Sequence, residues 1–366
     1  MAGHFTLHWG IIATGGIAEL FFKDLIADPA LRGVSDVAHL PVAVASRSIE
    51  KAQAFIDEFA PIELKSEITA YGTYTELLKD ESVDCVYIAT PASSHYANTL
   101  EALRAGKNVL CEKPFTVNAA QAKHLQIVAK ERNVFLMEGV WTRFFPLTIA
   151  FKRMLHEERI IGKVHRVFSD FSVLFDPARD LRMYRADTAG GALLDLGVYM
   201  NVWTLLSCYH HPDNELSPPT VLKASMLRSP ICPEIDESTT VITVWEKPQI
   251  MCIGTASMMT DSPADCVIRI QGTKGEIVIP IHGSRPEKIL VKLKGNGMDT
   301  CTLEYPIPGQ GLFWEADAVA RDIRDGKKED ENYPLDESVF AMSLMDEVRR
   351  QNNMNFPADI EFVEDY

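Results

Sequence analysis

The sequence predicts a protein of two parts: an α/β half with a doubly wound parallel sheet, followed by a half built on an open, mainly antiparallel sheet. The chain has 366 residues, which exceeds the usual length of one domain. Short apolar, β-branched runs alternate with helical patterns as far as about residue 140. After Arg143, strand-like runs follow one another with little helix between them.

The first half alternates strand and helix. Apolar runs typical of buried parallel strands are Leu7–Ala13, Pro41–Ala45, Asp84–Ala89, Asn108–Cys111 and Val134–Met137. Between them lie helical patterns: the spaced apolar residues Ile17, Phe21 and Leu25, then Ile49–Phe59, Tyr96–Ala105 and Asn118–Arg132. This order of elements requires right-handed crossovers and therefore a doubly wound sheet.

The second half begins with one amphipathic helix, about Leu147–Glu158. The strand-like segments that follow are Val164–Phe175, Thr220–Leu227, Thr239–Trp245, Gln249–Met258, Cys266–Gln271, Glu276–Ile281, Lys288–Lys294 and Cys301–Tyr305. Short turns join several of them, which favours antiparallel pairing. Helices return at Phe313–Asp325 and Asp336–Gln351. We therefore place the domains at residues 1–140 and 141–366, with C-terminal helices that can pack back on the first domain.

Composition excludes several classes of function. A net charge of −15 opposes binding to nucleic acid or to anionic lipid. No stretch approaches the roughly 18 apolar residues of a membrane span, and the N-terminus lacks a leader pattern, so we expect a cytoplasmic protein. The seven cysteines form no CxxC pair and the ten histidines are scattered, which favours reduced thiols and no metal site.

Two segments of the first half are candidates for binding a dinucleotide. Small residues at Gly10–Ala18, between a strand and a helix, let the backbone approach a pyrophosphate, although alanine replaces the first glycine of the usual pattern. A tight turn without a ligand is the alternative. At the end of the next strand, Ser46 and Arg47 replace the carboxylate that would bind a ribose 2′-hydroxyl, which favours NADP(H) unless Arg47 is simply a surface residue.

Two further segments carry candidate catalytic groups. Cys111-Glu112-Lys113-Pro114-Phe115 ends a strand where open α/β sheets place ligands, and its alternative is a plain turn into a helix. In the second half, glycines precede a helix on which Asp195 and Tyr199 share one face. A carboxylate and a phenol on one face can hold a polyol and exchange its proton. They could equally anchor a domain interface.

Together these segments resemble the glucose-fructose oxidoreductase/inositol dehydrogenase (Gfo/Idh/MocA) family, in particular its NADP-dependent D-xylose 1-dehydrogenase and dimeric trans-dihydrodiol dehydrogenase branch. The similarity covers nearly the whole chain. Its motifs are Trp9–Ala18, Ala89–Pro91 with His95, Glu112–Pro114, Glu138–Pro146, Gly190–Tyr199, Gln271–Glu276 and Gly311–Ala316.

The resemblance implies roles for individual residues. It places Thr14, Gly15, Gly16 and Ile17 at the pyrophosphate, Ser46 and Arg47 at the 2′-phosphate, and Thr90, Pro91 and His95 along the path to the nicotinamide. Glu112, Lys113, Trp141 and Arg143 complete the cofactor set. The substrate set is Lys113, Trp141, Phe144, Phe171, Arg182, Asp195 and Tyr199, although the chain from Ser172 to Thr188 has no clear motif.

The implied reaction oxidises the anomeric carbon of a sugar to a lactone, with hydride transfer to NADP. Tyr199 takes the hydroxyl proton, Lys113 acidifies the phenol and Asp195 completes the catalytic set. Because a free tyrosine has a pKa near ~10, the scheme needs that ammonium. Oxidation of a cyclic diol, or reduction of a dicarbonyl or ketosugar, is the alternative at the same site. The family fold also includes a non-catalytic dinucleotide-sensing regulator, so fold alone does not establish an enzyme.

An open antiparallel sheet needs one face covered. Helices can cover one side and a second subunit can pair with the other, so we expect a homodimer. The sequence does not identify the preferred sugar or diol, the physiological direction, or whether NAD is also accepted.

Overall fold

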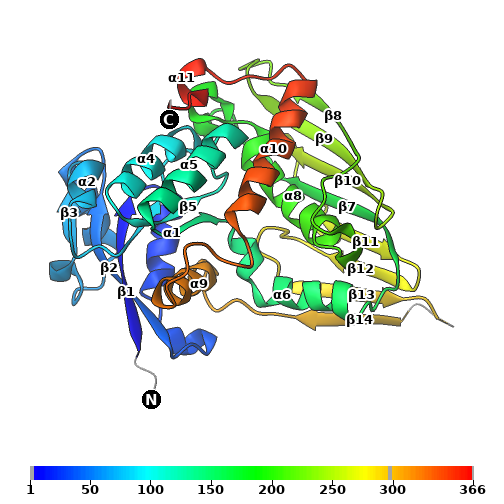
Figure 1. Ribbon diagram of the computed structural model, residues 1–366, viewed down its shortest axis with the longest axis horizontal. Coiled ribbons are helices and arrows are strands. Elements are labelled where there is room, and N and C mark those ends of the chain that lie inside the picture. The colour runs from blue at the N-terminus through cyan, green and yellow to red at the C-terminus, as the bar shows by residue number, and fades with distance from the viewer. Residues whose placement is uncertain (1–3, 296–298, 365–366) are drawn as a thin grey trace. The chain divides into compact units, whose positions relative to one another are not determined.

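The computed structural model describes residues 4–295 and 299–364 (Figure 1). Contacts divide the chain into two compact units. The first comprises Met1–Trp141, Ile307–Met342 and Glu361–Tyr366, and the second comprises Thr142–Pro306 and Ser343–Ile360. The assignment of cofactor binding to residues 1–140, and of substrate binding and dimerisation to residues 141–366, stays a prediction.

The first unit contains a parallel sheet in the order β3-β2-β1-β4-β5-β6. Its strands are β1 (Phe5–Ile12), β2 (Val37–Ala45), β3 (Thr69–Tyr71), β4 (Cys85–Ile88), β5 (Asn108–Glu112) and β6 (Leu136–Gly139). The associated helices are α1 (Gly16–Leu25), α2 (Ile49–Phe59), α3 (Tyr74–Leu78), α4 (Ala92–Arg104), α5 (Ala119–Arg132) and α9 (Phe313–Arg324). The strand order reverses between β1 and β4, and this switch point is where such sheets bind ligands.

Buried acidic residues attach α9 to the first unit. The Asp24 carboxylate, on α1, accepts the amides of Gln310, Gly311 and Leu312 at 2.8–2.9 Å. Gln310 and Gly311 precede α9 and Leu312 is its N-cap, so Asp24 holds the turn that leads into the helix. Asp317, farther along α9, accepts both forks of the Arg32 guanidinium at 2.8 Å.

The second unit contains a sheet in the order β14-β13-β12-β11-β7-β10-β9-β8. Its strands are β7 (Val164–Ser172), β8 (Val221–Arg228), β9 (Asp236–Trp245), β10 (Ile250–Ser257), β11 (Ile268–Gly272), β12 (Gly275–Ile279), β13 (Lys288–Leu293) and β14 (Asp299–Glu304). All neighbours are antiparallel except the parallel pair β7 and β10. The fold class that the sequence predicted is confirmed in both halves.

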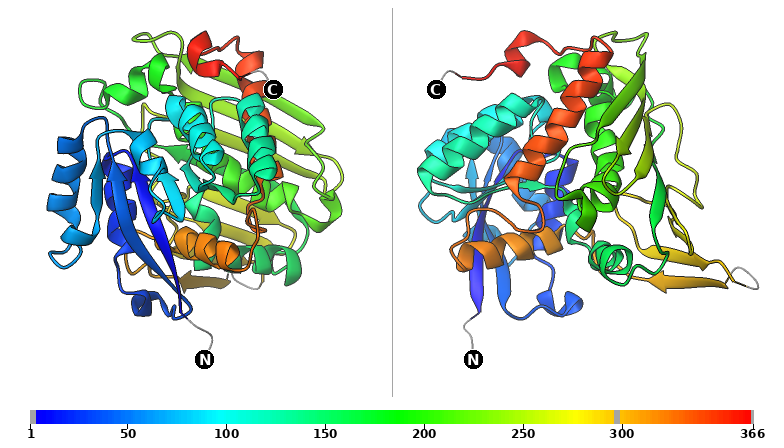
Figure 2. Two further views of the ribbon diagram at one scale, coloured as in Figure 1. Left: turned by 60° about the vertical axis from the view of Figure 1, so that its left-hand side comes forward. Right: turned by 45° about the vertical axis from the view of Figure 1, so that its right-hand side comes forward.

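Helices of the second unit cover one face of this sheet. They include α6 (Pro146–Lys152), α7 (Ala192–Asp195) and α8 (Gly197–Thr204), and α8 packs on β7 and β10 (Figure 2). On β9, buried residues alternate with exposed or half-buried ones such as Thr240 and Ile242. The helices α10 (Leu335–Gln351) and α11 (Ala358–Glu361) follow near the C-terminus.

Several elements differ from the sequence expectations. The sequence pattern missed β3, because three residues at a sheet edge give no periodicity. The predicted helix Leu147–Glu158 is α6 followed by a π-helical turn at Arg153–Glu157. The expectation that no segment is apolar enough to span a membrane was wrong. Within the described residues, one helical stretch, Ala186–Tyr209, is long and apolar enough by length and composition alone. It has 89% of its most apolar window buried inside the protein, as a core helix would.

Candidate active site

The turn after β1 is built to admit a ligand at its backbone. Ala13 has φ +80°, a left-handed conformation that favours the glycine of the usual pattern. A Cβ added at Gly15 or Gly16 would meet no described atom within 4 Å, so the surrounding protein does not require glycine there. Gly15 is the N-cap of α1 and makes no side-chain cap, which leaves helix amides for an anion such as a pyrophosphate. Ile17 is half-buried in the first turn.

The ends of β1 and β2 meet beside this turn. Thr14 Oγ1 lies 3.1 Å from Ser46 Oγ, and Ser46 is buried. Arg47 is exposed and has no ion-pair partner among the residues that the structure describes. An exposed guanidinium next to a buried hydroxyl, with no carboxylate to neutralise it, is suited to a phosphate group. These residues therefore fit the predicted NADP(H).

The ends of β4 and β5 are joined through His95. This residue lies in the first turn of α4 and is 1% exposed. Its Nδ1 is 2.7 Å from the carbonyl oxygen of Pro114 and its Nε2 is 2.8 Å from that of Thr90. The Thr90 hydroxyl accepts a hydrogen bond from Asn98 at 3.0 Å, whereas Pro91 is exposed as the N-cap of α4.

The backbone around half-buried Lys113 is held by two buried carboxyl groups. Glu112 Oε2 accepts the Lys113 amide at 3.1 Å, and Glu138 Oε1 accepts the Phe115 amide at 2.9 Å. The peptide bond between Lys113 and Pro114 is cis. Burial raises the pKa of Glu138 to about 7 and outweighs the hydrogen bond from Phe115.

Two more titratable side chains, Tyr87 and Glu315, interact with Glu112. The Tyr87 hydroxyl donates to Glu112 Oε1 at 2.5 Å, and burial, followed by the charge of Glu112, holds the pKa of Tyr87 well above its ordinary value. Glu315 on α9 is fully buried, and its oxygens have no hydrogen-bond partner among the described residues. Burial and the charges of Glu112 and Asp24 raise the pKa of Glu315.

The predicted residues after β6 form a short 3-10 helix, η3 (Trp141–Phe144). Trp141 is half-buried, Phe144 is 7% exposed and the Arg143 side chain is fully buried. Within the second unit, Arg143 Nη2 lies 3.1 Å from His210 Nε2. Because the Arg143 guanidinium is buried next to the His210 ring, the direction of its N–H donors is fixed.

In the second unit the structure groups four of the predicted substrate residues into two pairs. Asp195, at the end of α7, faces Arg182 with oxygen to nitrogen distances of 3.2 and 3.3 Å. Tyr199 on α8 packs on Phe171 of β7, with ring centroids 4.6 Å apart. A paired carboxylate and guanidinium can bind vicinal hydroxyls, and an aromatic pair can cover the apolar face of a ring.

The chain itself requires the glycines before α7. A Cβ at Gly190 would lie 2.5 Å from the Met183 carbonyl oxygen, and one at Gly191 would lie 2.6 Å from Asp236 Oδ1. Asp236 is fully buried and accepts the Leu193 amide at 2.9 Å. These close approaches bring the segment that carries Arg182 against the start of α7, which explains the glycines without a ligand.

The predicted site residues fall into two groups, one in each compact unit, and their roles stay predictions. Sequence reasoning missed the supporting side chains Glu138, Asp236 and Glu315. Glu138 carried a signal, because it directly follows the apolar run that ends in Leu136-Met137. Asp236 carried none, since it lies between Ile235 and Glu237 in a polar stretch. Charged residues are almost never buried without a specific reason.

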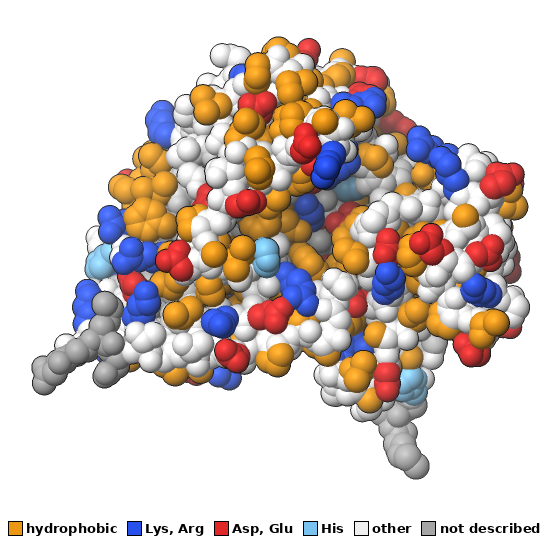
Figure 3. Space-filling model, turned by 180° about the vertical axis from the view of Figure 1, so that it is seen from behind, with side chains coloured by type: hydrophobic (Ala, Val, Ile, Leu, Met, Phe, Trp, Pro, Cys, Tyr) orange, Lys and Arg blue, Asp and Glu red, His pale blue; other side chains and the backbone are white. Residues whose placement is uncertain are grey.

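The surface face in Figure 3 mixes acidic and basic side chains with apolar ones, with no broad area of one charge. It therefore shows no electrostatic footprint of the kind that polyanion-binding proteins present.

Comparisons with known proteins identify the family. Residues 7–140 match the model of an oxidoreductase family with a NAD-binding Rossmann fold. A D-xylose 1-dehydrogenase (NADP(+)) from Hypocrea jecorina is 43% identical over 96% of this chain and 94% of its own length. A trans-1,2-dihydrobenzene-1,2-diol dehydrogenase from Danio rerio is 31% identical over 96% and 99%.

Among solved structures, KijD10, a 3-ketoreductase from Actinomadura kijaniata in complex with NADP and TDP-benzene, has the same fold. It matches with a TM-score of 0.78 and 25% identity, over 94% of this chain and 98% of that one. The chain therefore belongs to the Gfo/Idh/MocA family of oxidoreductases, as its motifs predicted.

Proposed function

We propose that this protein is a NADP-dependent dehydrogenase that oxidises the anomeric carbon of an aldose, of the D-xylose or D-glucose type, to the lactone. One observation carries the proposal: a D-xylose 1-dehydrogenase is 43% identical across 96% of the chain. NADP, when bound, accepts the hydride. The open backbone at Gly15 and Gly16 supports this coenzyme, as does the exposed Arg47, which has no ion-pair partner in the described part of the chain.

In this proposal Lys113 and Tyr199 act on the same hydroxyl group. The Tyr199 phenol takes the proton of the C1 hydroxyl, and the Lys113 ammonium stabilises the phenolate that a free tyrosine, with a pKa near ~10, would not form at neutral pH. Asp195, paired with Arg182, holds a neighbouring sugar hydroxyl. Lys113 belongs to the first compact unit and Tyr199 to the second.

Two substitutions test these roles. Lys113→Met and Tyr199→Phe should each lower kcat for D-xylose by about 100-fold or more, because each removes a group needed for proton transfer. The affinity for NADP, measured by titration calorimetry, should change little for Tyr199→Phe. Variants that oxidise D-xylose as fast as the wild type would refute the assignment.

The second candidate is oxidation of a cyclic trans-diol. It is favoured by the Danio rerio diol dehydrogenase, 31% identical over 96% of the chain, and by the aromatic pair of Phe171 and Tyr199. D-xylose, D-glucose and trans-dihydrobenzenediol should be compared by following NADPH absorbance. A larger kcat/KM for the diol would replace the sugar proposal. Tight NADP binding with no turnover on any of them would point to a regulator.

We further propose a homodimer formed through the open face of the second sheet. Ile242 and Ile253 are register partners, as are Val221 and Val244, so their side chains lie on that face. Ile242→Glu should yield a monomer in sedimentation velocity. The matched control is Ile62→Glu in the first unit, 80% exposed at present, which should leave the dimer intact. A dimer that survives Ile242→Glu would contradict the proposed face.

A cytoplasmic location is also part of the proposal. All seven cysteines are free, including Cys208 and Cys252, whose buried sulfurs lie 3.1 Å apart. None of the seven cysteines belongs to a CxxC pair, and this pattern supports a reducing compartment.

A further inference from the structure

The backbone that carries Lys113 is fastened at successive positions. As described above, Glu112 accepts the amide of Lys113, and Glu138 accepts the amide of Phe115. The carbonyl group of Pro114 lies between these two amides and faces Nδ1 of His95 at 2.7 Å. All of these residues belong to the first compact unit. The direction in which the Lys113 side chain leaves the loop therefore depends on these contacts.

His95 has an acceptor at each ring nitrogen. The Pro114 oxygen is 2.7 Å from Nδ1, and the Thr90 oxygen is 2.8 Å from Nε2. A carbonyl oxygen can only accept a hydrogen bond. A neutral imidazole carries one N–H, so it would direct a lone pair at one of these oxygens, at a distance where two acceptors repel. With the ring 1% exposed, bulk water is excluded from that position.

We infer that His95 is a doubly protonated positioning residue for Lys113, which ties the Pro114 carbonyl to the Thr90 carbonyl at the carboxyl end of β4. The inference rests on the proposed function, because it takes Lys113 as a catalytic residue. It differs from the sequence prediction that His95 lines the path to the nicotinamide. In a positioning role His95 acts on kcat through Lys113, whereas a coenzyme contact would act on NADP affinity.

Charge around the loop is consistent with an imidazolium. The carboxyl groups of Glu112 and Glu138 hold the amides on either side of the carbonyl that His95 holds. A buried cation is tolerated where opposite charge and hydrogen bonds compensate it. The loop thus has acceptors for its amides and donors for its carbonyl, each from a buried side chain.

The first test reads the protonation state of His95 in the wild-type protein. The protein is labelled with ¹⁵N-histidine, and the side-chain nitrogen signals are recorded at pH 7.5, with His95 assigned by its absence from the His95→Gln spectrum. We expect the pattern of an imidazolium, with both ring nitrogens protonated. A neutral tautomer, with one protonated and one bare nitrogen, would overturn the inference. This result does not depend on what the protein catalyses.

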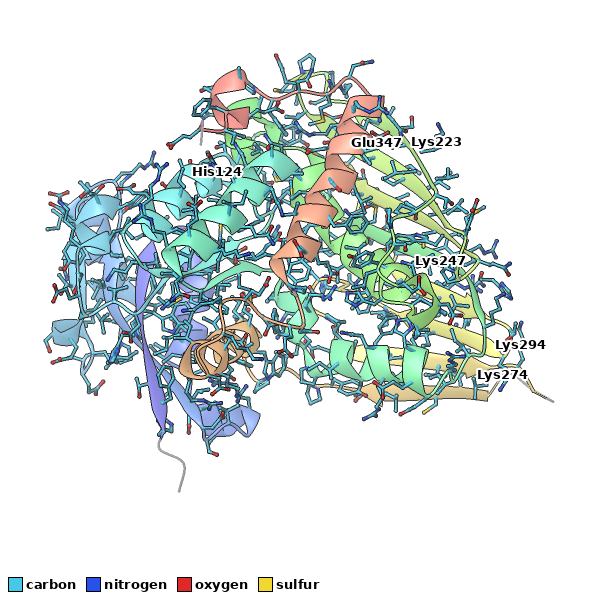
Figure 4. All side chains as sticks on the ribbon, viewed as in Figure 1. His124, Lys223, Lys247, Lys274, Lys294 and Glu347 are labelled. Atoms are coloured by element: carbon cyan, nitrogen blue, oxygen red, sulfur yellow. The ribbon has the colours of Figure 1, made fainter. Side chains whose placement is uncertain are left out.

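The second test separates positioning from coenzyme contact. His95→Gln keeps one donor, so Lys113 loses its fixed direction and kcat should fall by about 10- to 100-fold, while the Kd for NADP stays within about twofold. The matched control is His124→Gln on α5 (Figure 4), because His124 is also buried but its Nδ1 faces the Tyr96 hydroxyl at 2.6 Å, which can donate. His124→Gln should leave kcat and Kd unchanged.

A double-mutant cycle completes the design. If His95 acts through Lys113, adding His95→Gln to Lys113→Met should lower kcat no further. Independent losses, or a Kd for NADP that rises as much as kcat/KM falls, would contradict the positioning role. Thermal unfolding of each variant shows whether it is folded, and if His95→Gln is not, His95→Asn replaces it both in the assignment of the spectrum and in the kinetics. A fully active Lys113→Met would refute the proposed catalytic role without changing the imidazolium assignment.

Discussion

Replacing Gly16 with alanine should strengthen the fold and weaken coenzyme binding at the same time. Gly16 is the first residue of α1, and an added Cβ would have no described atom within 4 Å. Alanine restricts the unfolded chain more than glycine does, so the free energy of unfolding should rise by about 0.4–1 kcal/mol. Urea unfolding measures this gain.

The loss of affinity follows from the same open space. A methyl group there would stand between the helix amides and a pyrophosphate. Losing one hydrogen bond to a charged group costs about 1.5–3 kcal/mol, which corresponds to about a 10- to 150-fold increase in the Kd for NADP. Titration calorimetry measures the Kd directly. A Gly16→Ala protein that binds NADP as tightly as the wild type would refute this location of the pyrophosphate.

Gly10 provides the control for this experiment. It lies in the strand that precedes the turn, and its added Cβ would come within 2.8 Å of Leu77 Cδ2 and 2.9 Å of Val83 Cγ1. Gly10→Ala should therefore destabilise the protein by about 1–3 kcal/mol through overpacking. Loss of stability in Gly16→Ala as well would mean that Gly16 is a packing residue.

Three other outcomes are expected. Asp24→Ala should lower the free energy of unfolding by at least about 3 kcal/mol in urea, because it removes the carboxylate that accepts three amides in the turn leading into α9. Lys23→Ala, an exposed neighbour, should change it little. Arg47→Ala should lower kcat/KM for NADP about tenfold relative to kcat/KM for NAD, and should leave the free energy of unfolding unchanged. Equal effects on both coenzymes would exclude a 2′-phosphate contact. Burial raises the pKa of Glu138 from 4.5 to about 7, so its ionisation lowers the stability of the folded protein as pH rises between these values. Across that range the free energy of unfolding of Glu138→Gln should rise by up to about 3 kcal/mol relative to the wild type. A difference in urea unfolding that does not depend on pH would contradict this.

The sequence predicts the parts of this molecule that rest on local periodicity. The helix Ile49–Phe59 has the predicted bounds, and the strand Asn108–Glu112 extends one residue beyond the predicted Asn108–Cys111. Buried runs of this kind have few other solutions. The glycine-rich turn was also recognisable, since its pattern lies within nine residues.

Features formed by distant residues were not predictable. The Asp24 cap of α9 joins residues 286 to 288 positions apart, and nothing near Asp24 in the sequence indicates it. The contact between His95 and Pro114 joins the segments that follow β4 and β5, and only the folded sheet brings these segments together. Gly190 and Gly191 were open to two interpretations, because a glycine required by a neighbouring carbonyl and one required by a ligand are identical in sequence.

The attachment of α9 also constrains how the protein is made. The first compact unit includes Ile307–Met342, so a ribosome synthesises most of the chain before the partners of Asp24 and Arg32 exist. We therefore expect this unit to complete its folding late, and not in the usual order, in which an N-terminal domain folds while the rest emerges. A nascent chain stalled at residue 300 should hold its early strands in a protease-sensitive state, and release of the last sixth of the polypeptide should make them resistant.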